Sequence, residues 1–279
     1  MVLLIPKKFT RVLMKTLQHP PIVMVLAMVL SSSALARPEW KLVWADEFSG
    51  PEISRTNWTY DIGATGWGNQ ELQCYTDRPA NSYVTNDASG NGMLVIEAKP
   101  EDFKGAKFTS ARLKTQGLQR WTYGKVEARI SIPGGKGIWP AFWMLGENLP
   151  TVGWPACGEI DILEHVEAYD MRPTSVRSSL HGPARSAANS IHGDTQVQKL
   201  AGNFHTFTAE WEPTEVRWYL DGKQYFSAKR GDVAGNWVFD HPFFIIMNVA
   251  VGGSWPGAPD ATTKFPARML VDYIRVYQK

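Results

Sequence analysis

The chain has 279 residues, of which 12% are aromatic, and it contains 12 tryptophans. A chain of this length suits one large domain or two small ones. The formal net charge of +2 is misleading, because residues 1–36 contain Lys7, Lys8, Arg11 and Lys15 but no acid, which leaves 25 basic and 27 acidic side chains in the remainder. This slightly acidic remainder argues against a protein that binds nucleic acid or an anionic membrane surface.

Residues 1–36 are predicted to be a signal peptide. The apolar run from Ile22 to Leu30 is followed by three serines and then by Ala34-Leu35-Ala36, a small-x-small cleavage site. The run is short for a membrane span. Met14 would open a signal peptide of ordinary length, so we suspect that it is the true start. We expect secretion or export to a periplasm, cleavage near Ala36, and no stable membrane anchor.

Beyond Arg37 the hydrophobic pattern has a period of two, which is typical of half-buried strands. The predicted strands are, in chain order, residues 94–98, 125–132, 204–211, 216–220, 223–226 and 270–277. Asp221-Gly222 separates two of these runs and predicts a hairpin with a two-residue turn. Many short strands punctuated by glycine and proline indicate an all-β fold, an antiparallel sandwich or jelly roll, formed by a single domain of residues 37–279.

Two residue types leave alternatives open at this point. The tryptophans could stack on sugar rings at the surface, or they could fill the core of a sandwich. Cys74 and Cys157 could form a disulfide in an exported protein. A domain of this size does not need that bond, and the sequence does not show whether the two Cα atoms lie within bridging distance.

The segment from Gly158 to Glu164 is the most informative part of the chain. Glu159 and Asp161 share one face of a strand, because side chains alternate between faces. Strict alternation would turn Glu164 toward the core, where an unpaired carboxylate is costly. One extra residue accommodated as a β-bulge at Ile162-Leu163 returns Glu164 to the face of the other two acids. We therefore predict three carboxyl groups on one surface of one strand.

Crowded acids destabilise a strand, so this arrangement favours a catalytic role. Retaining glycosidases use two carboxyl groups about 5–5.5 Å apart, one as an ionised nucleophile and one as a protonated acid. In that interpretation, Asp161 helps to separate the pKa values of Glu159 and Glu164. The alternative is an exposed edge strand whose acids are simply solvated.

Six segments of the chain resemble glycoside hydrolase family 16, in its laminarinase-like (endo-β-1,3-glucanase) branch. They are VWADEF (43–48), GWGNQELQCYT (66–76), GIWPAFWMLG (137–146), WPACGEIDILE (154–164), NVAVGGSWPG (248–257) and VDYIRVY (271–277). The resemblance implies a β-jelly-roll of two curved antiparallel sheets with a concave substrate cleft. It also implies that Glu159 is the nucleophile, Asp161 the assisting acid and Glu164 the general acid/base in the hydrolysis of internal β-1,3 bonds of glucan.

The spacing between the acids bears on the substrate. The extra residue between Asp161 and Glu164 is typical of laminarinases and of some galactan-cleaving members, whereas mixed-linkage lichenases typically lack it. Hydrolysis of mixed-linkage β-1,3-1,4-glucan or of a galactan such as carrageenan remains the alternative. A non-catalytic β-glucan-binding module is a further alternative, although such binders usually lack the paired glutamates.

The resemblance also implies which residues bind sugar. The matching positions are Asn69, Arg112, Trp139, Trp143, Trp154, His181 and Trp255. Trp139 and Trp143 lie four residues apart on one predicted strand, so both face the cleft or both face the core. For His181 a purely structural role is the alternative.

Many relatives carry a calcium ion on the convex sheet, away from the cleft. The matching ligands in this chain are the carboxylate of Glu47, the carbonyl of Gly92 and the carboxylate of Asp272. Oxygen ligands suit Ca²⁺, and the ion would join the first strand to the last. The alternative is that Glu47 and Asp272 are ordinary exposed acids. We expect no organic cofactor, a polysaccharide as the binding partner, and a monomer.

Overall fold

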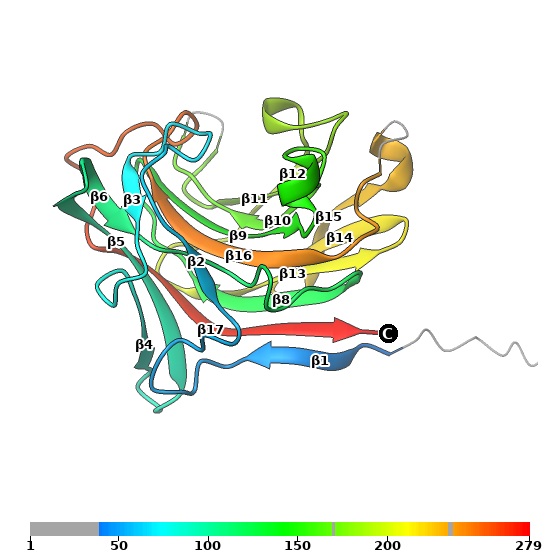
Figure 1. The fold of residues 1–279 in the computed structure, drawn as a ribbon, viewed down its shortest axis with the longest axis horizontal. Coiled ribbons are helices and arrows are strands. Elements are labelled where there is room, and N and C mark those ends of the chain that lie inside the picture. The colour runs from blue at the N-terminus through cyan, green and yellow to red at the C-terminus, as the bar shows by residue number, and fades with distance from the viewer. Residues whose placement is uncertain (1–38, 169–170, 234–236) are drawn as a thin grey trace, which may run out of the picture. The chain divides into compact units, whose positions relative to one another are not determined.

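A curved seven-stranded sheet forms one layer of the molecule (Figure 1). We describe the computed structural model over residues 39–168, 171–233 and 237–279, so the predicted signal peptide lies outside the described residues. The strands of this sheet are, in spatial order, β12 (Ile191–Gln196), β11 (Ser175–His181), β10 (Glu159–Glu164), β9 (Ile138–Gly146), β16 (Phe243–Val251), β7 (Arg112–Lys114) and β2 (Thr59–Asp61). All of their pairings are antiparallel.

A ten-stranded sheet forms the second layer. Its main path runs through β15 (Lys223–Lys229), β14 (Glu215–Leu220), β13 (Phe204–Glu212), β8 (Gly124–Ser131), β17 (Ala267–Gln278), β5 (Gly92–Phe103), β6 (Ala106–Ser110) and β3 (Gln73–Tyr75). Two further strands, β1 (Lys41–Asp46) and β4 (Ser82–Asn86), pair with β17 and β5. The pair β3–β6 is parallel, a local departure from the expected antiparallel sheets.

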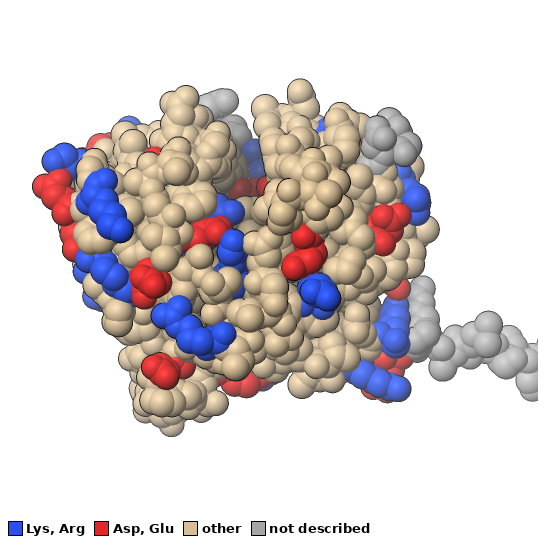
Figure 2. Space-filling view, in the orientation of Figure 1, with Lys and Arg blue, Asp and Glu red and all other residues tan. Residues whose placement is uncertain are grey.

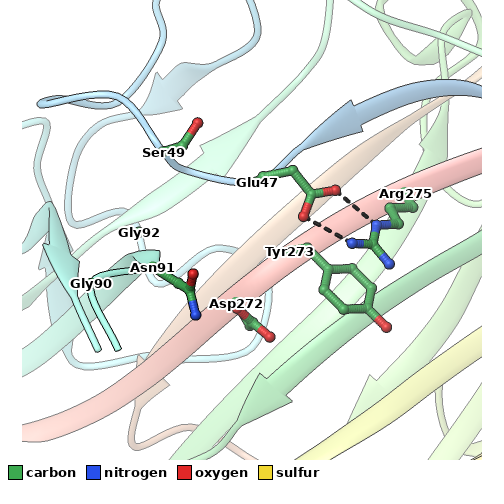
Figure 3. A pocket seen from close by; sticks show the side chains of 8 residues that line it. All are labelled: Glu47, Ser49, Gly90, Asn91, Gly92, Asp272, Tyr273 and Arg275. Carbon is green, nitrogen blue, oxygen red and sulfur yellow. Dashed lines mark hydrogen bonds and ion pairs between the residues drawn. The ribbon is translucent and has the colours of Figure 1, made fainter. Parts of the chain in front are cut away.

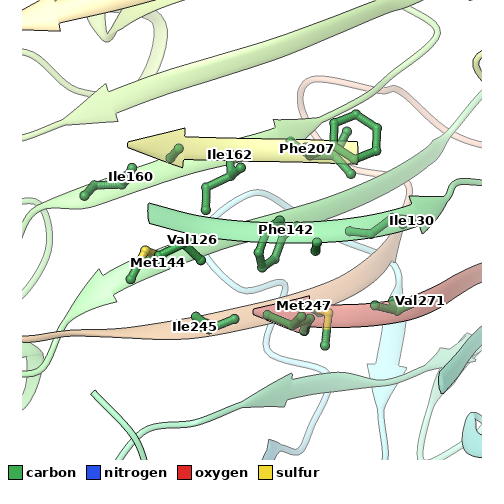
Figure 4. Close-up of a cluster of buried hydrophobic side chains, with 14 of the residues drawn as sticks. Val126, Ile130, Phe142, Met144, Ile160, Ile162, Phe207, Ile245, Met247 and Val271 are labelled. Atoms are coloured by element: carbon green, nitrogen blue, oxygen red, sulfur yellow. The ribbon is translucent and has the colours of Figure 1, made fainter. Parts of the chain in front are cut away.

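The two sheets enclose a hydrophobic core to which both contribute alternate side chains (Figure 4). On β8 the buried residues are Val126, Ala128 and Ile130, so the predicted alternation of this strand is confirmed. On β10 the buried apolar residues include Ile160 and Ile162. This two-layer β-sandwich is the predicted jelly-roll fold.

Helical structure in the described part of the chain is limited to short turns. These are α1 (Leu149–Val152) and two 3₁₀ turns, Ala187–Asn189 and Arg230–Val233. Among the described residues no helix is long and apolar enough to cross a membrane. Residues 38–279 form one compact unit.

Local predictions from the sequence can be compared directly with this structure. Asp221 and Gly222 have φ values of +49° and +75° between β14 and β15, so the predicted two-residue hairpin turn is confirmed. Cys74 and Cys157 are both free and buried, which settles the open question against a disulfide. Their thiols donate to backbone carbonyls of the next residue instead.

Candidate active site

The catalytic segment predicted from the sequence forms β10, an interior strand of the seven-stranded sheet between β11 and β9. Toward β9, the register runs regularly to Asp161 opposite Trp143 and resumes with Leu163 opposite Phe142, so Ile162 is the extra residue. Toward β11, the same interruption lies between Asp161 and Glu164. The predicted β-bulge is therefore confirmed. It places Ile162 in the core and returns Glu164 to the face of the other acids.

The surface of the molecule is hollowed between two groups of loops at the top of Figure 2, above the seven-stranded sheet. Three side chains of β10 face this cleft side of the sheet. Glu159 and Glu164 are partly exposed, whereas Asp161 is 2% exposed. Carboxylate oxygens of Glu159 and Asp161 and a ring nitrogen of His181 lie within 4.8 Å of one another. The acids thus form one cluster rather than a row of separately solvated charges.

Each glutamate accepts a hydrogen bond from a different tryptophan. The indole N–H of Trp154 donates to Oε2 of Glu159 at 2.9 Å. The indole N–H of Trp139 donates to Oε1 of Glu164 at 3.2 Å. Two of the predicted sugar-binding tryptophans therefore also orient the two carboxyl groups.

His181 faces the acids from β11, directly opposite Glu159 in the strand register. The backbone N–H of Ala187 donates to Nδ1 of His181 at 3.1 Å, so Nδ1 carries no proton and the ring proton is on Nε2. Nε2 lies 2.9 Å from Oδ2 of Asp161, without hydrogen-bond geometry, and 3.6 Å from Oε1 of Glu159. The Nε2 edge of the ring therefore lies close to both acids.

Burial raises the pKa values of all three acids, and charge repulsion adds to this effect at Glu159 and Glu164. Burial, and then the charge of Asp161, raises the pKa of Glu159 to about 8. Burial likewise raises the pKa of Asp161. Burial, with the charges of Asp161 and Glu159 in addition, raises the pKa of Glu164 well above its usual range. Burial thus favours the protonated form of each of the three acids.

Trp139 and Trp143 are both partly exposed on β9 between buried neighbours, so they share the cleft face. Trp255 packs edge-on against Trp139, with ring centroids 5.2 Å apart and an interplanar angle of 88°. Trp154 is 47% exposed, and its ring centroid lies 6.1 Å from that of His181. Aromatic side chains thus flank the acids on both sides.

Arg112 lies in the cleft wall between two indole rings. Its guanidinium carbon is 4.7 Å from the ring centroid of Trp143 and 5.1 Å from that of Trp67. Its Nε lies 2.9 Å from Oδ2 of Asp61. These contacts hold the guanidinium cation in a fixed position beside the acids. Its charge lowers the pKa of Glu159 slightly, but the opposite effect of burial is larger.

A chain of hydrogen bonds, not anticipated from the sequence, connects Trp143 to Asn69. The indole N–H of Trp143 donates to Asn248, whose amide donates to the hydroxyl of Tyr75. That hydroxyl donates to Glu71, which also accepts a hydrogen bond from Asn69. The segments around 66–76 and 248–257 contained these residues, but only their meeting in space gives Glu71, Tyr75 and Asn248 a role. Asn69, Trp143 and, through its contact with the Trp143 ring, Arg112 thus belong to one connected set of side chains.

The three predicted calcium ligands line a single surface pocket of about 400 Å³ (Figure 3). Ser49 and Asn91 line it as well, so the donors are mainly oxygen atoms, which suits a hard cation. Both carboxylate oxygens of Glu47 accept hydrogen bonds from Arg275, at 2.7 and 2.9 Å. Asp272 accepts one from Arg129 at 2.7 Å. Arg275 also lines this pocket, so a cation bound to Glu47 would take the place of its guanidinium group.

Comparisons with known proteins identify the family of the chain. The family model for glycosyl hydrolases family 16 matches residues 67–275. The chain is 46% identical to the solved laminarinase catalytic domain from Thermotoga maritima MSB8, with a TM-score of 0.79 and coverage of 87% of this chain and 99% of that one. It is 41% identical over 254 residues to the beta-glucanase of Rhodothermus marinus, covering 86% of each chain.

A third relative is a much longer protein. The chain is 42% identical over 244 residues to the clotting factor G alpha subunit of Tachypleus tridentatus, which covers 86% of this chain but 34% of that protein. The chain therefore spans about a third of the clotting factor subunit and most of the other two relatives. From the family model, the sandwich fold and the acid cluster together, we conclude that the chain is a glycoside hydrolase and belongs to glycosyl hydrolases family 16.

Proposed function

We propose that the chain is a retaining endo-glycosidase that hydrolyses internal β-1,3 bonds of laminarin-type glucans. The observation that carries the proposal is the bulge in β10, which turns Glu159 and Glu164 to the same face, each with its own indole donor. A retaining glycosidase needs one carboxylate that attacks the sugar and one carboxylic acid that protonates the leaving oxygen. The similarity to laminarinases at 41–46% identity supports β-1,3-glucan as the substrate.

In this proposal Glu159 is the nucleophile and Glu164 the general acid/base, the roles that the resemblance to family 16 implies. Glu159 has Trp154 and the Nε2–H of His181 beside it, and both favour its ionised form. Glu164 accepts its hydrogen bond on Oε1, so its proton is carried on Oε2. Burial and the charges of Asp161 and Glu159 raise the pKa of Glu164 well above its usual range, which favours the protonated form that a general acid needs.

In the first step, Glu159 attacks the anomeric carbon while Glu164 transfers its proton to the departing glycosidic oxygen. The bond between the anomeric carbon and that oxygen breaks, and an ester forms between the sugar and Glu159. In the second step, the Glu164 carboxylate takes a proton from water, and the hydroxide replaces Glu159 at the same carbon. Two inversions give a product with the original β configuration.

Asp161 and His181 both influence the pKa values of the two glutamates. Asp161 lies between the glutamates in sequence and is almost completely buried, so its charge is felt by both. When Glu159 loses its charge on forming the ester, one source of repulsion on Glu164 disappears, and the pKa of Glu164 falls. This fall favours the change of Glu164 from acid to base that the second step requires.

The positions of the tryptophans support an endo mode of attack. Trp139 and Trp255 lie on the Glu164 side of the cluster, whereas Trp154 lies beside Glu159. Sugar units on both sides of the cleaved bond would each have an aromatic face for stacking. The hollow above the seven-stranded sheet (Figure 2) supports the same mode of attack.

The proposal also includes export and a structural calcium ion. The signal-peptide pattern in residues 1–36 supports export. The carboxylates of Glu47 and Asp272 and the carbonyl of Gly92 would hold the ion, joining the segment after β1 to β5 and β17. Bound there, calcium would neutralise two acids and stabilise the ends of the domain, at a distance from the chemistry.

Reducing-sugar assays on laminarin, lichenan and carrageenan test the proposed function. We expect release of oligosaccharides from laminarin to be fastest. Glu159→Gln should abolish turnover and preserve laminarin binding, whereas Glu127→Gln is a matched control, because the exposed fractions of these side chains are 17% and 16% for Glu127 and Glu159. Faster cleavage of lichenan or carrageenan would show that laminarin is not the preferred substrate. If the unaltered chain binds laminarin without cleaving it, the chain is a glucan-binding protein and not a hydrolase.

A further inference from the structure

The bulge in β10 contains two carbonyl groups that accept hydrogen bonds from side chains of other strands. The indole N–H of Trp218 donates to the carbonyl oxygen of Asp161 at 2.8 Å. The hydroxyl of Ser178 donates to the carbonyl oxygen of Ile162 at 2.9 Å. The two acceptors are consecutive residues at the point where the register shifts. Both carbonyls of the irregular segment thus have a side-chain donor.

These donors belong to a rigid part of the core. Trp218 and Ser178 are both 0% exposed. Trp218 lies on β14 in the ten-stranded sheet and stacks on Phe226, with ring centroids 4.8 Å apart. The hydroxyl of Tyr225, on β15 of the same sheet, forms a hydrogen bond with Ser178. The catalytic strand is therefore connected across the core to the sheet that carries no catalytic acid.

The position of the bulge decides which way Glu164 points. If the bulge were removed, side-chain alternation would turn Glu164 toward the core and away from Glu159. A buried carbonyl without a donor is costly, so the two side-chain donors favour this bulge over a regular strand. Misplacement of a reacting group by about 1 Å can cost roughly 100-fold in rate.

We propose that Trp218, and the Ser178–Tyr225 pair, are positioning residues that fix the catalytic bulge from the opposite face of the sheet. They do not contact the cleft. They hold the backbone of Asp161 and Ile162, and through it they set the separation of Glu159 and Glu164. The inference rests on the proposed roles of the two glutamates in double displacement.

Trp218→Phe tests the proposal, with Trp211→Phe as its matched control. Trp211 is 1% exposed, and its indole N–H also donates to a backbone carbonyl at 2.8 Å, but the acceptor is Phe239, outside the catalytic strand. Both variants lose one buried hydrogen bond and keep most of an aromatic ring, so we expect similar losses of thermal stability.

The two variants should differ in catalysis on laminarin. We expect Trp218→Phe to lower kcat roughly 10- to 100-fold with KM almost unchanged, because the cleft surface is preserved while the acids are misplaced. The basic limb of its pH–rate profile should also move, since the surroundings of Glu164 change. Trp211→Phe should keep the kcat and the pH profile of the unaltered enzyme.

Equal kcat values for the two variants would overturn the proposal, as would a loss of activity in Trp218→Phe that appears only in KM. If Trp218→Phe does not fold, Ser178→Ala decides: it removes one O–H from the bulge, and an unchanged kcat and pH profile would overturn the inference. The unaltered enzyme tests the proposed function separately. If that function is wrong, the unaltered enzyme will not cleave laminarin with retention, and this is seen before any substitution is made.

Discussion

Replacing Glu159 by glutamine should make the protein more stable at neutral pH, although it abolishes turnover. The Glu159 carboxyl is largely buried next to Asp161 and Glu164, and this environment opposes its charged form. Glutamine has nearly the same shape and stays neutral at every pH. Its carbonyl oxygen can still accept the hydrogen bond from Trp154. The substitution therefore removes the electrostatic cost and keeps the packing.

The pKa shift of Glu159 gives the size and sign of this effect. The unfolded chain releases the proton near pH 4.5, whereas the folded chain holds it until about pH 8. Between these values the folded state binds more protons, so the stability of the unaltered protein falls as pH rises. At pH 7 the window is about 2.5 pH units, which at 1.36 kcal/mol per unit gives about 3 kcal/mol as an upper bound. Asp161 shares the repulsion, so we expect a gain of roughly 1–3 kcal/mol, or ~3–8 °C in Tm.

Thermal unfolding of the unaltered protein and of Glu159→Gln at pH 4 and pH 7 measures this gain. The advantage of the glutamine variant should be small at pH 4, where both folded and unfolded carboxyls are protonated, and should grow toward pH 7. Glu127→Gln, on the ten-stranded sheet, is the control for a change from glutamate to glutamine away from the acid cluster. A glutamine variant that is less stable at pH 7, or whose advantage is the same at both pH values, would refute the reasoning.

Three further predictions concern pH, calcium and the cleft wall. The acidic limb of kcat/KM should have its midpoint above the usual 4.5 of a glutamic acid, because the pKa of Glu159 is raised to about 8; a midpoint at or below 4.5 would contradict this. A chelator should lower Tm and leave activity at low temperature nearly unchanged. If the chelator abolishes turnover while Tm stays the same, calcium has a catalytic role instead of a structural one. Arg112→Lys should raise the KM for laminarin roughly 3- to 30-fold with kcat little changed, since lysine cannot stack between Trp67 and Trp143; an unchanged KM would remove Arg112 from substrate binding.

The catalytic strand could be predicted from the sequence because its evidence is local. Alternation of side chains along a strand placed Glu159 and Asp161 together, and the cost of burying Glu164 required one extra residue. The hairpin at Asp221-Gly222 was predictable for a similar reason, since two neighbouring residues determine the turn. Such inferences need only the residues within one or two strands.

The remaining features of the site depend on contacts between distant segments. Trp218 is 57 residues from the carbonyl that it contacts, and nothing in the sequence near β14 indicates that partner. Asn248 and Tyr75 are 173 residues apart and meet only because β16 packs close to β3. The ion pair between Glu47 and Arg275 likewise joins opposite ends of the domain. The sequence motifs that contain these residues indicated functional regions, but they did not show which residues contact each other.

The anomeric form of the first product tests the central claim most directly. Proton NMR during hydrolysis of laminarin resolves the α and β signals of the newly formed reducing end before mutarotation mixes them. Attack by Glu159 followed by attack of water predicts that the β signal appears first and that the α signal follows slowly. An α signal that appears first would mean a single displacement by water, and the nucleophilic role of Glu159 would be wrong.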